Sequence, residues 1–288
     1  MKVSGITIVK NAVEYDYPVV ESITSLLPLV DEMIVSIGDC TDATVKLIAE
    51  IASPKIKIIH TIWNKQLTSN GTVLAVETNK ALAQVTKDSD WIIYLQADEV
   101  LHEADVNVIL QAMQLYKNDT KVEGLLFNYK HFYGSYNYVG DSRCWYKHEI
   151  RIVKNNINVQ SYKDAQGFRI NNKKLRVKKI AAYIYHYGWV RTPNAQLKKL
   201  NNFYTYWGGT TNTQIADTEM YDYLKNVDSI AKYEGTHPSI MQQRIANNNW
   251  EITYDVKLKN FTKKDWILYK IEKWTGKRLF DYKNYKIV

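Results

Sequence analysis

Short apolar runs alternate with segments of helical periodicity over roughly the first 117 residues of the chain. The strand-like runs cover residues 5–10, 32–38, 56–62 and 91–95. Helical patterns begin at Pro18, Asp42 and Thr72, and a fourth covers residues 103–116. Strands that alternate with crossover helices predict a mostly parallel sheet with helices on both faces. Such a sheet binds its ligands at the carboxyl ends of its strands.

Beyond residue 120 the pattern changes to aromatic, strand-like segments at 124–133, 145–153 and 177–186. They are separated by turn residues, which favours antiparallel additions to the sheet. From Pro193 the pattern is helical again, and no Gly/Ser-rich or Pro-rich linker precedes it. We therefore predict an α/β domain over residues 1–190, with a ligand-binding half (1–117) and a second half (118–190). A helical C-terminal extension (191–288) is expected to pack on this domain.

Composition excludes several classes of protein. Of 288 residues, 45% are apolar and 24% charged, which is typical of a folded soluble domain. Cys40 and Cys144 do not form a CxxC pair, so a disulfide framework or a thiolate zinc site is not expected. The first apolar run is too short for a signal peptide, and no stretch approaches about 20 apolar residues. These features favour a cytoplasmic protein, soluble or peripheral at the inner face of a membrane.

The net charge of +8 admits anionic partners, and much of it lies near the C-terminus. Residues 257–286 hold ten Lys or Arg and three acids, interleaved with Trp, Tyr and Phe. A helix of this composition suits an anionic membrane surface, where lipid-linked acceptors reside. The alternative is a helix packed on the domain with a solvated basic face. No recognition motif accompanies the charge, so nucleic acid is not an expected partner.

Two acidic clusters directly follow strand-like runs. In DWIIYLQADEV (90–100), Asp98 and Glu99 stand just past the strand, where carboxylates can hold a divalent cation against a diphosphate. A solvated turn that caps the next helix is the alternative. In GDCTDAT (38–44), Asp39 can accept hydrogen bonds from a base or ribose, whereas Asp42 and Thr44 suit a helix cap.

The order of SGITIVKNA, GDCTDAT, Asn79 in a helix, and DWIIYLQADEVL resembles the nucleotide-sugar-binding half of a family 2 glycosyltransferase with the GT-A fold. The resemblance covers about residues 3–105. WYKHEIRIVKN, YKDAQGF, YHYGWVR, YEGTHPSIM and TGKRLFDYKNYK are similar to a bacterial subgroup and extend it more weakly. It implies inverting transfer of a sugar from a nucleotide-sugar, UDP-sugar by default. The implied acceptor is a glycan, a lipid-linked sugar or another hydroxyl compound, in surface polysaccharide synthesis.

The resemblance also implies roles for individual residues. Asp39 would contact the uracil or ribose, and the backbone from Val9 to Asn11 would complete the base pocket. Asp98 matches the second acid of the family's DxD motif, which binds Mn²⁺ or Mg²⁺ at the donor diphosphate. Gln96 replaces the first acid and brings no charge to a metal, so the need for a metal stays open.

Further site candidates lie in the second half. His186 is a candidate metal ligand or an aromatic-packed histidine. Arg191 is a candidate partner for the donor phosphates or a surface arginine. For the general base that takes the acceptor's proton we favour Asp164 over Glu149, because Glu149 stands two residues from Arg151 and would form an ion pair with it. Asp141 and Glu99 follow as weaker candidates, and His237 is expected to belong to a structural turn.

Three other functions remain open. Gln96 in place of an acid is compatible with a catalytically silent module that binds a sugar-nucleotide or glycan. The basic tail is compatible with a surface-binding protein. A nucleotidyltransferase would share the sheet, but the Gly-rich loop expected at the first strand is absent from residues 9–11. The sequence does not predict the sugar, the nucleotide, the acceptor, the linkage or the oligomeric state.

Overall fold

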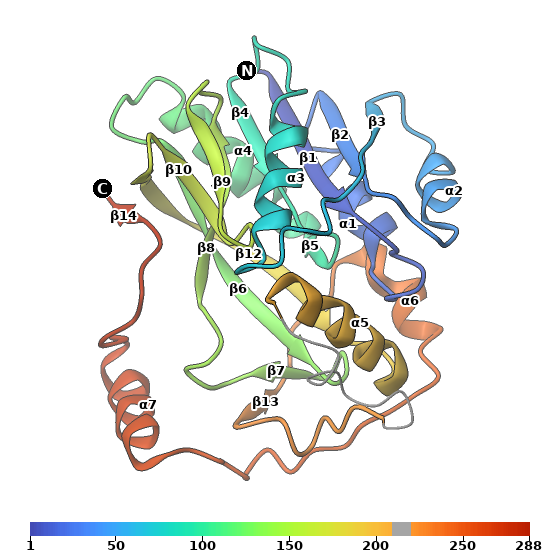
Figure 1. Ribbon diagram of the computed structural model, residues 1–288. Helices are drawn as coiled ribbons and strands as arrows, with labels where there is room; N and C mark the ends of the chain where they lie inside the picture. Colours follow the sequence, from blue (N-terminus) through green and yellow to red (C-terminus); the bar gives the residue numbers. More distant parts are fainter. Residues whose placement is uncertain (209–219) are drawn as a thin grey trace.

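The four strand-like runs of the first half form adjacent parallel strands. The computed structural model describes residues 1–208 and 220–288. The strands lie in the order β4-β1-β2-β3 within a larger sheet (Figure 1). Their bounds are β1 (Val3–Val9), β2 (Glu32–Ile37), β3 (Ile56–His60) and β4 (Trp91–Tyr94). Every residue of β1, β2 and β4 is buried, as expected for strands covered on both faces.

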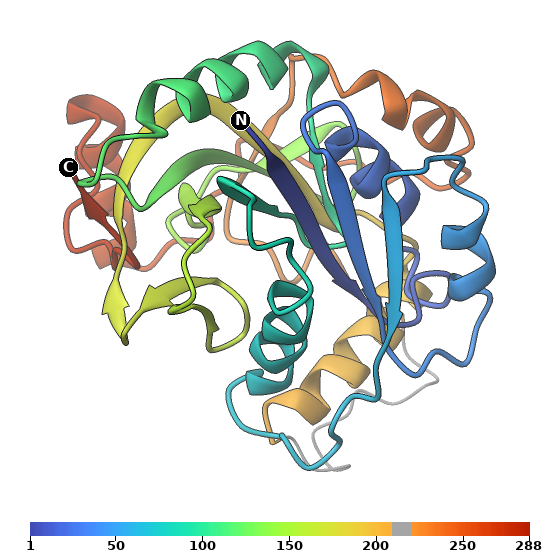
Figure 2. The ribbon, with the colours of Figure 1, turned by 90° about the horizontal axis from the view of Figure 1, so that it is seen from above.

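Helices cover the two faces of this sheet, as the view from above shows (Figure 2). A separate hydrophobic core lies on each face. On one face, α1, α2 and α4 pack against alternate residues of β1 and β2, including Val9 and Val35. On the other face, α3 packs against Ile6, Ile8 and Ile34. The bounds are α1 (Val19–Leu26), α2 (Thr44–Ala49), α3 (Thr72–Leu82), η1 (Glu103–Asp105) and α4 (Val106–Tyr116).

The second half extends the sheet with mainly antiparallel pairings. β8 lies between β4 and β6 and is antiparallel to both, whereas β12 runs parallel to β6 and antiparallel to β5. The bounds are β5 (Glu99–Leu101), β6 (Gly124–Tyr133), β7 (Tyr138–Gly140), β8 (His148–Lys154) and β12 (Arg176–Trp189). A small separate sheet holds β9 (Val159–Tyr162), β10 (Gly167–Ile170) and β11 (Lys173–Lys174). The predicted mixed α/β fold is thus confirmed.

Two predicted strand bounds need correction. The strand expected from residue 145 begins at His148, because residues 141–147 form a loop whose side chains contact the C-terminal segment. The strand expected to end at His186 continues to Trp189, where it still pairs with Tyr133 of β6. His186 therefore lies inside β12, with its side chain buried, rather than at the end of the strand.

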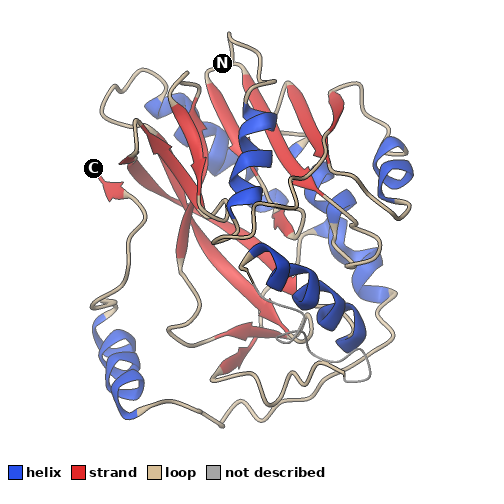
Figure 3. Cartoon of the chain, in the orientation of Figure 1, coloured by secondary structure: helices blue, strands red, loops and turns tan. Residues whose placement is uncertain are grey.

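The described part of the C-terminal extension contains helices, as expected, and also two short strands that were not predicted (Figure 3). Its described elements are α5 (Pro193–Tyr206), β13 (Ile230–Lys232), η3 (Ser239–Met241), α6 (Gln242–Ala246), α7 (Lys263–Thr275) and β14 (Lys286–Ile287). Residues 209–219 of the extension lie outside the described part. β13 pairs with β7 and β14 pairs with β12, so the extension adds strands to the central sheet. The boundary between an α/β domain and the C-terminal extension at residue 190 stays a prediction.

None of the helices within residues 1–208 and 220–288 is long and apolar enough to cross a bilayer.

Candidate active site

A buried ion pair fixes the turn that follows β4. The Arg151 guanidinium on β8 donates from Nε and Nη2 to the two carboxylate oxygens of Glu99, at 2.8 Å each. Glu99 also accepts a hydrogen bond from the Gln96 backbone N–H at 3.1 Å and from the Tyr129 hydroxyl at 2.7 Å. Arg151 is 1% exposed and Glu99 0%, so this pair is fully withdrawn from water. Glu99 therefore holds the turn that carries Gln96 and Asp98.

Asp98 projects from this turn into a cluster of nitrogen atoms. Its Oδ2 lies 3.2 Å from Lys199 Nζ on α5, and its Oδ1 lies 3.8 Å from His186 Nε2 on β12. Lys199 also donates to the Gly188 carbonyl at 2.8 Å. Burial alone would raise the pKa of Asp98, but the charge of Lys199 and the nearby His186 lower it below the usual value. Asp98 is therefore ionised across the physiological pH range.

Lys199 is a site residue that the sequence analysis missed. Burial and the charge of Arg191 lower the pKa of Lys199 to about 8, against the opposite effect of Asp98. Lys199 lies over the rings of Tyr17 and Phe203. In the sequence, only the helical spacing of Lys199 to Asn202, Phe203 and Tyr206 places it on a common face with other site residues. These residues do not form the continuous apolar stripe that would have marked this face.

The hydrogen bonds of His186 define which of its ring nitrogens is free. His131 Nε2 donates to the Tyr146 carbonyl, at 2.8 Å, so the Nδ1 of a neutral His131 accepts. That Nδ1 lies 3.0 Å from His186 Nδ1, which must therefore carry the proton. Burial lowers the pKa of both rings and favours their neutral forms. His186 Nε2 thus keeps a lone pair on the side of Asp98.

A pocket of about 560 Å³ opens next to this cluster. Its walls come from the end of β1, the aromatic loop that follows β1 and carries Tyr15 and Tyr17, the β4 turn and α5. The lining residues include Val9, Lys10, Tyr15, Tyr17, Trp63, Gln96, Ala97, Asp98, Asn202, Phe203 and Tyr206. This volume includes space that is open to solvent, and the lining combines aromatic rings with few polar groups, as small-ligand sites do. The carboxyl ends of β1 and β4 therefore meet at an open, aromatic-lined pocket.

Three of the six predicted donor-binding residues line this pocket, and the other three, Asn11, Asp39 and Arg191, are not in the lining. Val9, Gln96 and Asp98 are in the lining. Asp39 accepts hydrogen bonds from Lys10 Nζ at 2.8 Å and from the Trp63 backbone N–H at 3.1 Å, so it supports two lining residues.

Asn11 connects two of the loops at the strand ends. Its side-chain amide contacts Glu14 and both the hydroxyl and the backbone N–H of Thr41. Asn11 adopts a left-handed backbone conformation with φ of 51°, which asparagine tolerates better than most residues. It therefore joins the loop after β1 to the loop after β2.

Arg191 is fully buried and is not among the residues that line the pocket. Its guanidinium donates to the carbonyls of Tyr15 and Gly188, at 2.6 and 3.0 Å, and lies over the ring of Tyr17. In this position it supports the aromatic loop that contributes Tyr15 and Tyr17 to the pocket wall. A contact of Arg191 with donor phosphates stays a prediction.

The two candidate bases, Asp164 and Glu149, lie outside the pocket lining. The predicted ion pair between Glu149 and Arg151 is wrong. Arg151 pairs with Glu99, not with Glu149, because the strand register places the guanidinium under the β4 turn. Glu149 Oε2 is buried with no hydrogen-bond partner among the described residues. Burial raises the pKa of Glu149 to about 8, although the charge of Arg151 acts in the opposite direction.

Asp164 lies in the turn between β9 and β10. A Cβ placed on Gly71 would come within 2.7 Å of Asp164 Cβ and 2.8 Å of the Trp207 ring, so the three residues are packed together. Burial raises the pKa of Asp164, and its Oδ1 has no hydrogen-bond partner among the described residues. Asp164 is half-buried, whereas Glu149 is buried.

Comparisons with known proteins were made for the whole chain. A family model described as glycosyl transferase family 2 matches residues 4–176. No curated protein matches the chain. Among solved structures, S. aureus TarS is 15% identical with a TM-score of 0.41, over 70% of this chain and 39% of TarS. TarS 1–349 in complex with UDP-GlcNAc is 14% identical with a TM-score of 0.40, over 70% and 65% of the two chains.

A third structure shares a smaller part of the chain. Mannosyl-3-phosphoglycerate synthase from Rubrobacter xylanophilus is 17% identical with a TM-score of 0.32, over 46% of this chain and 41% of that one. The chain therefore spans less than two thirds of the length of each of these three proteins.

The raised pKa of Glu149 predicts how stability depends on pH. Between about pH 4.5 and 8 the unfolded chain has released a proton that the native carboxyl retains, so the free energy of unfolding falls as the pH rises. Glu149→Gln mimics the neutral carboxyl and removes this effect. We expect equal stability of variant and wild type at about pH 4. Toward pH 8 the variant gains up to about 1.4 kcal/mol per pH unit.

Urea denaturation across this pH range measures the difference. Glu50→Gln, at the exposed end of α2, is the control for the loss of an exposed carboxyl. A wild-type to Glu149→Gln difference that does not change with pH would show that the native carboxyl is already charged.

Proposed function

Because the chain belongs to glycosyltransferase family 2, we propose that it is an inverting glycosyltransferase whose nucleotide-sugar donor binds in the pocket between β1, the β4 turn and α5. The pocket next to Asp98 is the observation that carries this proposal. UDP-sugar is the default donor, and the acceptor is a hydroxyl group of a glycan, a lipid-linked sugar or another compound. The pathway is surface polysaccharide or glycan synthesis, in the cytoplasm.

The aromatic walls suit the nucleoside part of the donor. Tyr15, Tyr17, Trp63 and Tyr206 offer ring faces on which a base can stack. Lys10 is held between the Asp39 carboxylate and the Trp63 ring, and its charge faces the same cavity. Asp39 and the backbone from Val9 to Asn11 bind the base and ribose, and Gln96 offers its side-chain amide to a ribose hydroxyl.

The residues at Asp98 fit a divalent cation as a two-ligand set. Asp98 Oδ1 and His186 Nε2 are both acceptors, lie 3.8 Å apart and have no proton between them, which suits two ligands of one metal ion. No group of three or more candidate ligands occurs among residues 1–208 and 220–288. The remaining ligands would therefore come from the donor diphosphate and water. A bound Mn²⁺ or Mg²⁺ would supply electrostatic stabilisation of the leaving diphosphate.

Lys199 contributes a positive charge of the protein's own to this end of the pocket. It binds Asp98 Oδ2 and so leaves Oδ1 for the cation. The paired Lys199 ammonium and Asp98 carboxylate are the charged groups of the protein that would lie next to the donor diphosphate. Where Gln96 replaces the family's acid and weakens the hold on a cation, Lys199 offers the diphosphate a positive charge that does not depend on a metal.

Inverting transfer requires a base on the acceptor side. The acceptor oxygen attacks the anomeric carbon, the bond from that carbon to the diphosphate breaks, and the nucleoside diphosphate leaves with the electron pair. The acceptor proton passes to a carboxylate. Asp164 is the better candidate at neutral pH, because Glu149, with its pKa raised to about 8, remains largely protonated there.

The roles of the two carboxyls are tested by single variants in a donor-turnover assay with UDP-sugars. We expect Asp164→Asn to lower turnover by roughly 10²- to 10⁴-fold, the range for a general base. Glu149→Gln is the matched control and is expected to retain most of it. The opposite result would assign the base to Glu149. Nucleotide binding without turnover in the wild type would favour the alternative function, a catalytically silent sugar-nucleotide or glycan-binding module.

The metal assignment is tested by calorimetric titration of UDP with Mn²⁺ or with EDTA. We expect Mn²⁺ to strengthen UDP binding to the wild type, and this effect to be lost in Asp98→Ala and in His186→Ala. His60→Ala, an exposed position at the end of β3, is the control and keeps the effect. An Mn²⁺ effect that survives in both site variants would place the cation elsewhere.

A further inference from the structure

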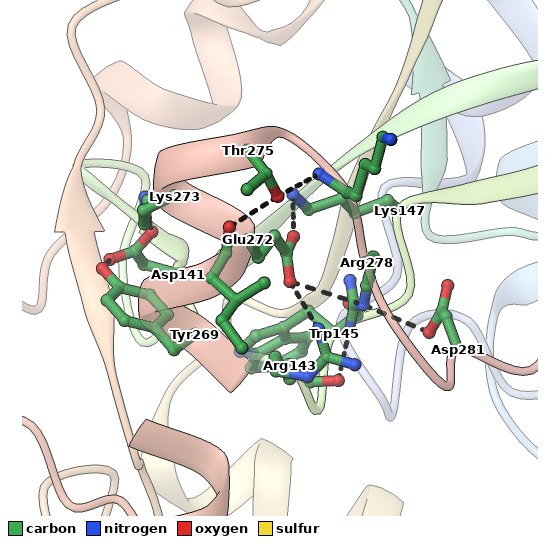
Figure 4. A network of polar contacts seen from close by, with 12 residues as sticks. Asp141, Arg143, Trp145, Lys147, Tyr269, Glu272, Lys273, Thr275, Arg278 and Asp281 are labelled. Atoms are coloured by element: carbon green, nitrogen blue, oxygen red, sulfur yellow. Dashed lines mark hydrogen bonds and ion pairs between the residues drawn. The ribbon is translucent and has the colours of Figure 1, made fainter. Parts of the chain in front are cut away.

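Helix α7 is attached to the rest of the protein through charged and polar side chains (Figure 4). Glu272 is the one residue of α7 that is buried. Its carboxylate accepts a hydrogen bond from Arg143 Nη1 at 2.8 Å, pairs with Lys147, and lies 3.9 Å from Arg278 Nε. Three positive groups from the 141–147 loop and from the segment after α7 therefore converge on one carboxylate.

A second cluster anchors the same side of the helix. Asp141 accepts hydrogen bonds from the Tyr269 hydroxyl and from Lys273 Nζ, at 2.6 Å each, and from Lys259 Nζ at 3.2 Å. Farther along the chain, β14 pairs with β12. The helix is thus fixed to the domain at several points.

Other positions of α7 carry exposed aromatic and apolar residues. Trp266 is 50% exposed, Ile267 53% and Trp274 89%. The segment that follows adds Phe280, 92% exposed and with a left-handed φ of 59° that is unusual for a bulky residue. Leu279 and Tyr282 are exposed as well. A helix that packed on a domain in the ordinary way would show the reverse arrangement.

Basic residues accompany these rings, and the one acid of residues 277–282, Asp281, is paired with Arg278 Nε at 3.1 Å. Lys263, Lys264, Lys270 and Lys277 are exposed and form no ion pair with any described residue. The two acids of α7 are engaged elsewhere: Glu272 lies in its cluster, and Asp265 accepts a hydrogen bond from the hydroxyl of the N-cap Thr262. The outward face therefore combines positive charge with Trp, Ile and Phe side chains.

We propose that α7 and residues 277–282 bind the surface of an anionic lipid bilayer. Trp266, Trp274 and Phe280 enter the boundary between headgroups and acyl chains, where amphipathic aromatic rings are favoured. The four exposed lysines contact lipid phosphates. The helix lies along the surface, since it is neither long nor apolar enough to span a bilayer. This inference goes beyond the proposed function and does not depend on it.

The combination of exposed basic, aromatic and aliphatic side chains fits a bilayer better than a nucleic acid. A single-stranded nucleic acid would use the lysines and stack its bases on the exposed aromatic rings, but the aliphatic Ile267 and Leu279 would then have no role. A bilayer accounts for the charge and for the apolar groups together. The same orientation keeps the Glu272 and Asp141 clusters on the protein side, so binding requires no rearrangement of the domain.

The test is sedimentation of the full chain with vesicles of phosphatidylcholine, with and without phosphatidylglycerol. We expect binding to the anionic vesicles that weakens with added salt, and at least roughly tenfold weaker binding to neutral ones. A variant with Trp266→Ser, Trp274→Ser and Phe280→Ser should lose at least about tenfold in affinity. Ile157→Ser, at a position 98% exposed between β8 and β9, is the matched control and should bind like the wild type.

Thermal unfolding of the triple variant checks that it folds, which is expected because its three changed side chains are exposed. A second variant, with Lys263, Lys264, Lys270 and Lys277 changed to Gln, should lose the preference for anionic vesicles. Equal binding of the wild type to neutral and anionic vesicles, or unchanged binding of both variants, would overturn the proposal. Tight binding to double-stranded DNA with none to vesicles would also overturn it. In solution, we expect both variants to turn over the donor as the wild type does, so the vesicle experiment does not test the proposed function.

Discussion

The buried pair of Arg151 and Glu99 is the interaction on which the candidate active site depends. Two charges withdrawn from water are tolerated only when they are paired and fully hydrogen-bonded, and removal of one partner typically costs about 3–5 kcal/mol. Here the guanidinium on β8 holds the carboxylate, and the carboxylate holds the backbone of Gln96. The turn after β4 is therefore fixed by the antiparallel part of the sheet, and Asp98 is fixed with it.

Three distant parts of the chain meet at Asp98. The β4 turn supplies the carboxylate, β12 supplies His186, and α5 supplies Lys199 together with one wall of the pocket. The C-terminal extension thus takes part in the site from its first helix onward. Its last helix, α7, is held against the 141–147 loop by Glu272, Tyr269 and Lys273, which leaves Trp266, Trp274 and the unpaired lysines exposed.

Local pattern predicted the strands of the first half and the acidic turn after β4, because both follow from neighbouring residues. Lys199 was missed because 101 positions separate it from Asp98 and no local motif marks it. The prediction that Arg151 pairs with Glu149 failed for a similar reason. Glu149 is near in sequence, but the register of β4 and β8 brings Glu99 close to Arg151. The two short strands of the extension were not predicted, because its Tyr- and Asn-rich composition does not reveal strands that form only by pairing with β7 and β12.

The most direct test of the account is thermal unfolding of the wild type in the presence of UDP, GDP, CDP or dTDP. A nucleotide that binds the folded protein at a hundred times its dissociation constant adds about 2.7 kcal/mol to the free energy of unfolding. The account predicts that one of the four, with UDP first, stabilises the protein, and that Asp39→Ala reduces this effect. If none of them stabilises it, with or without Mn²⁺, the pocket between β1, the β4 turn and α5 is not a nucleotide site and the central claim is wrong.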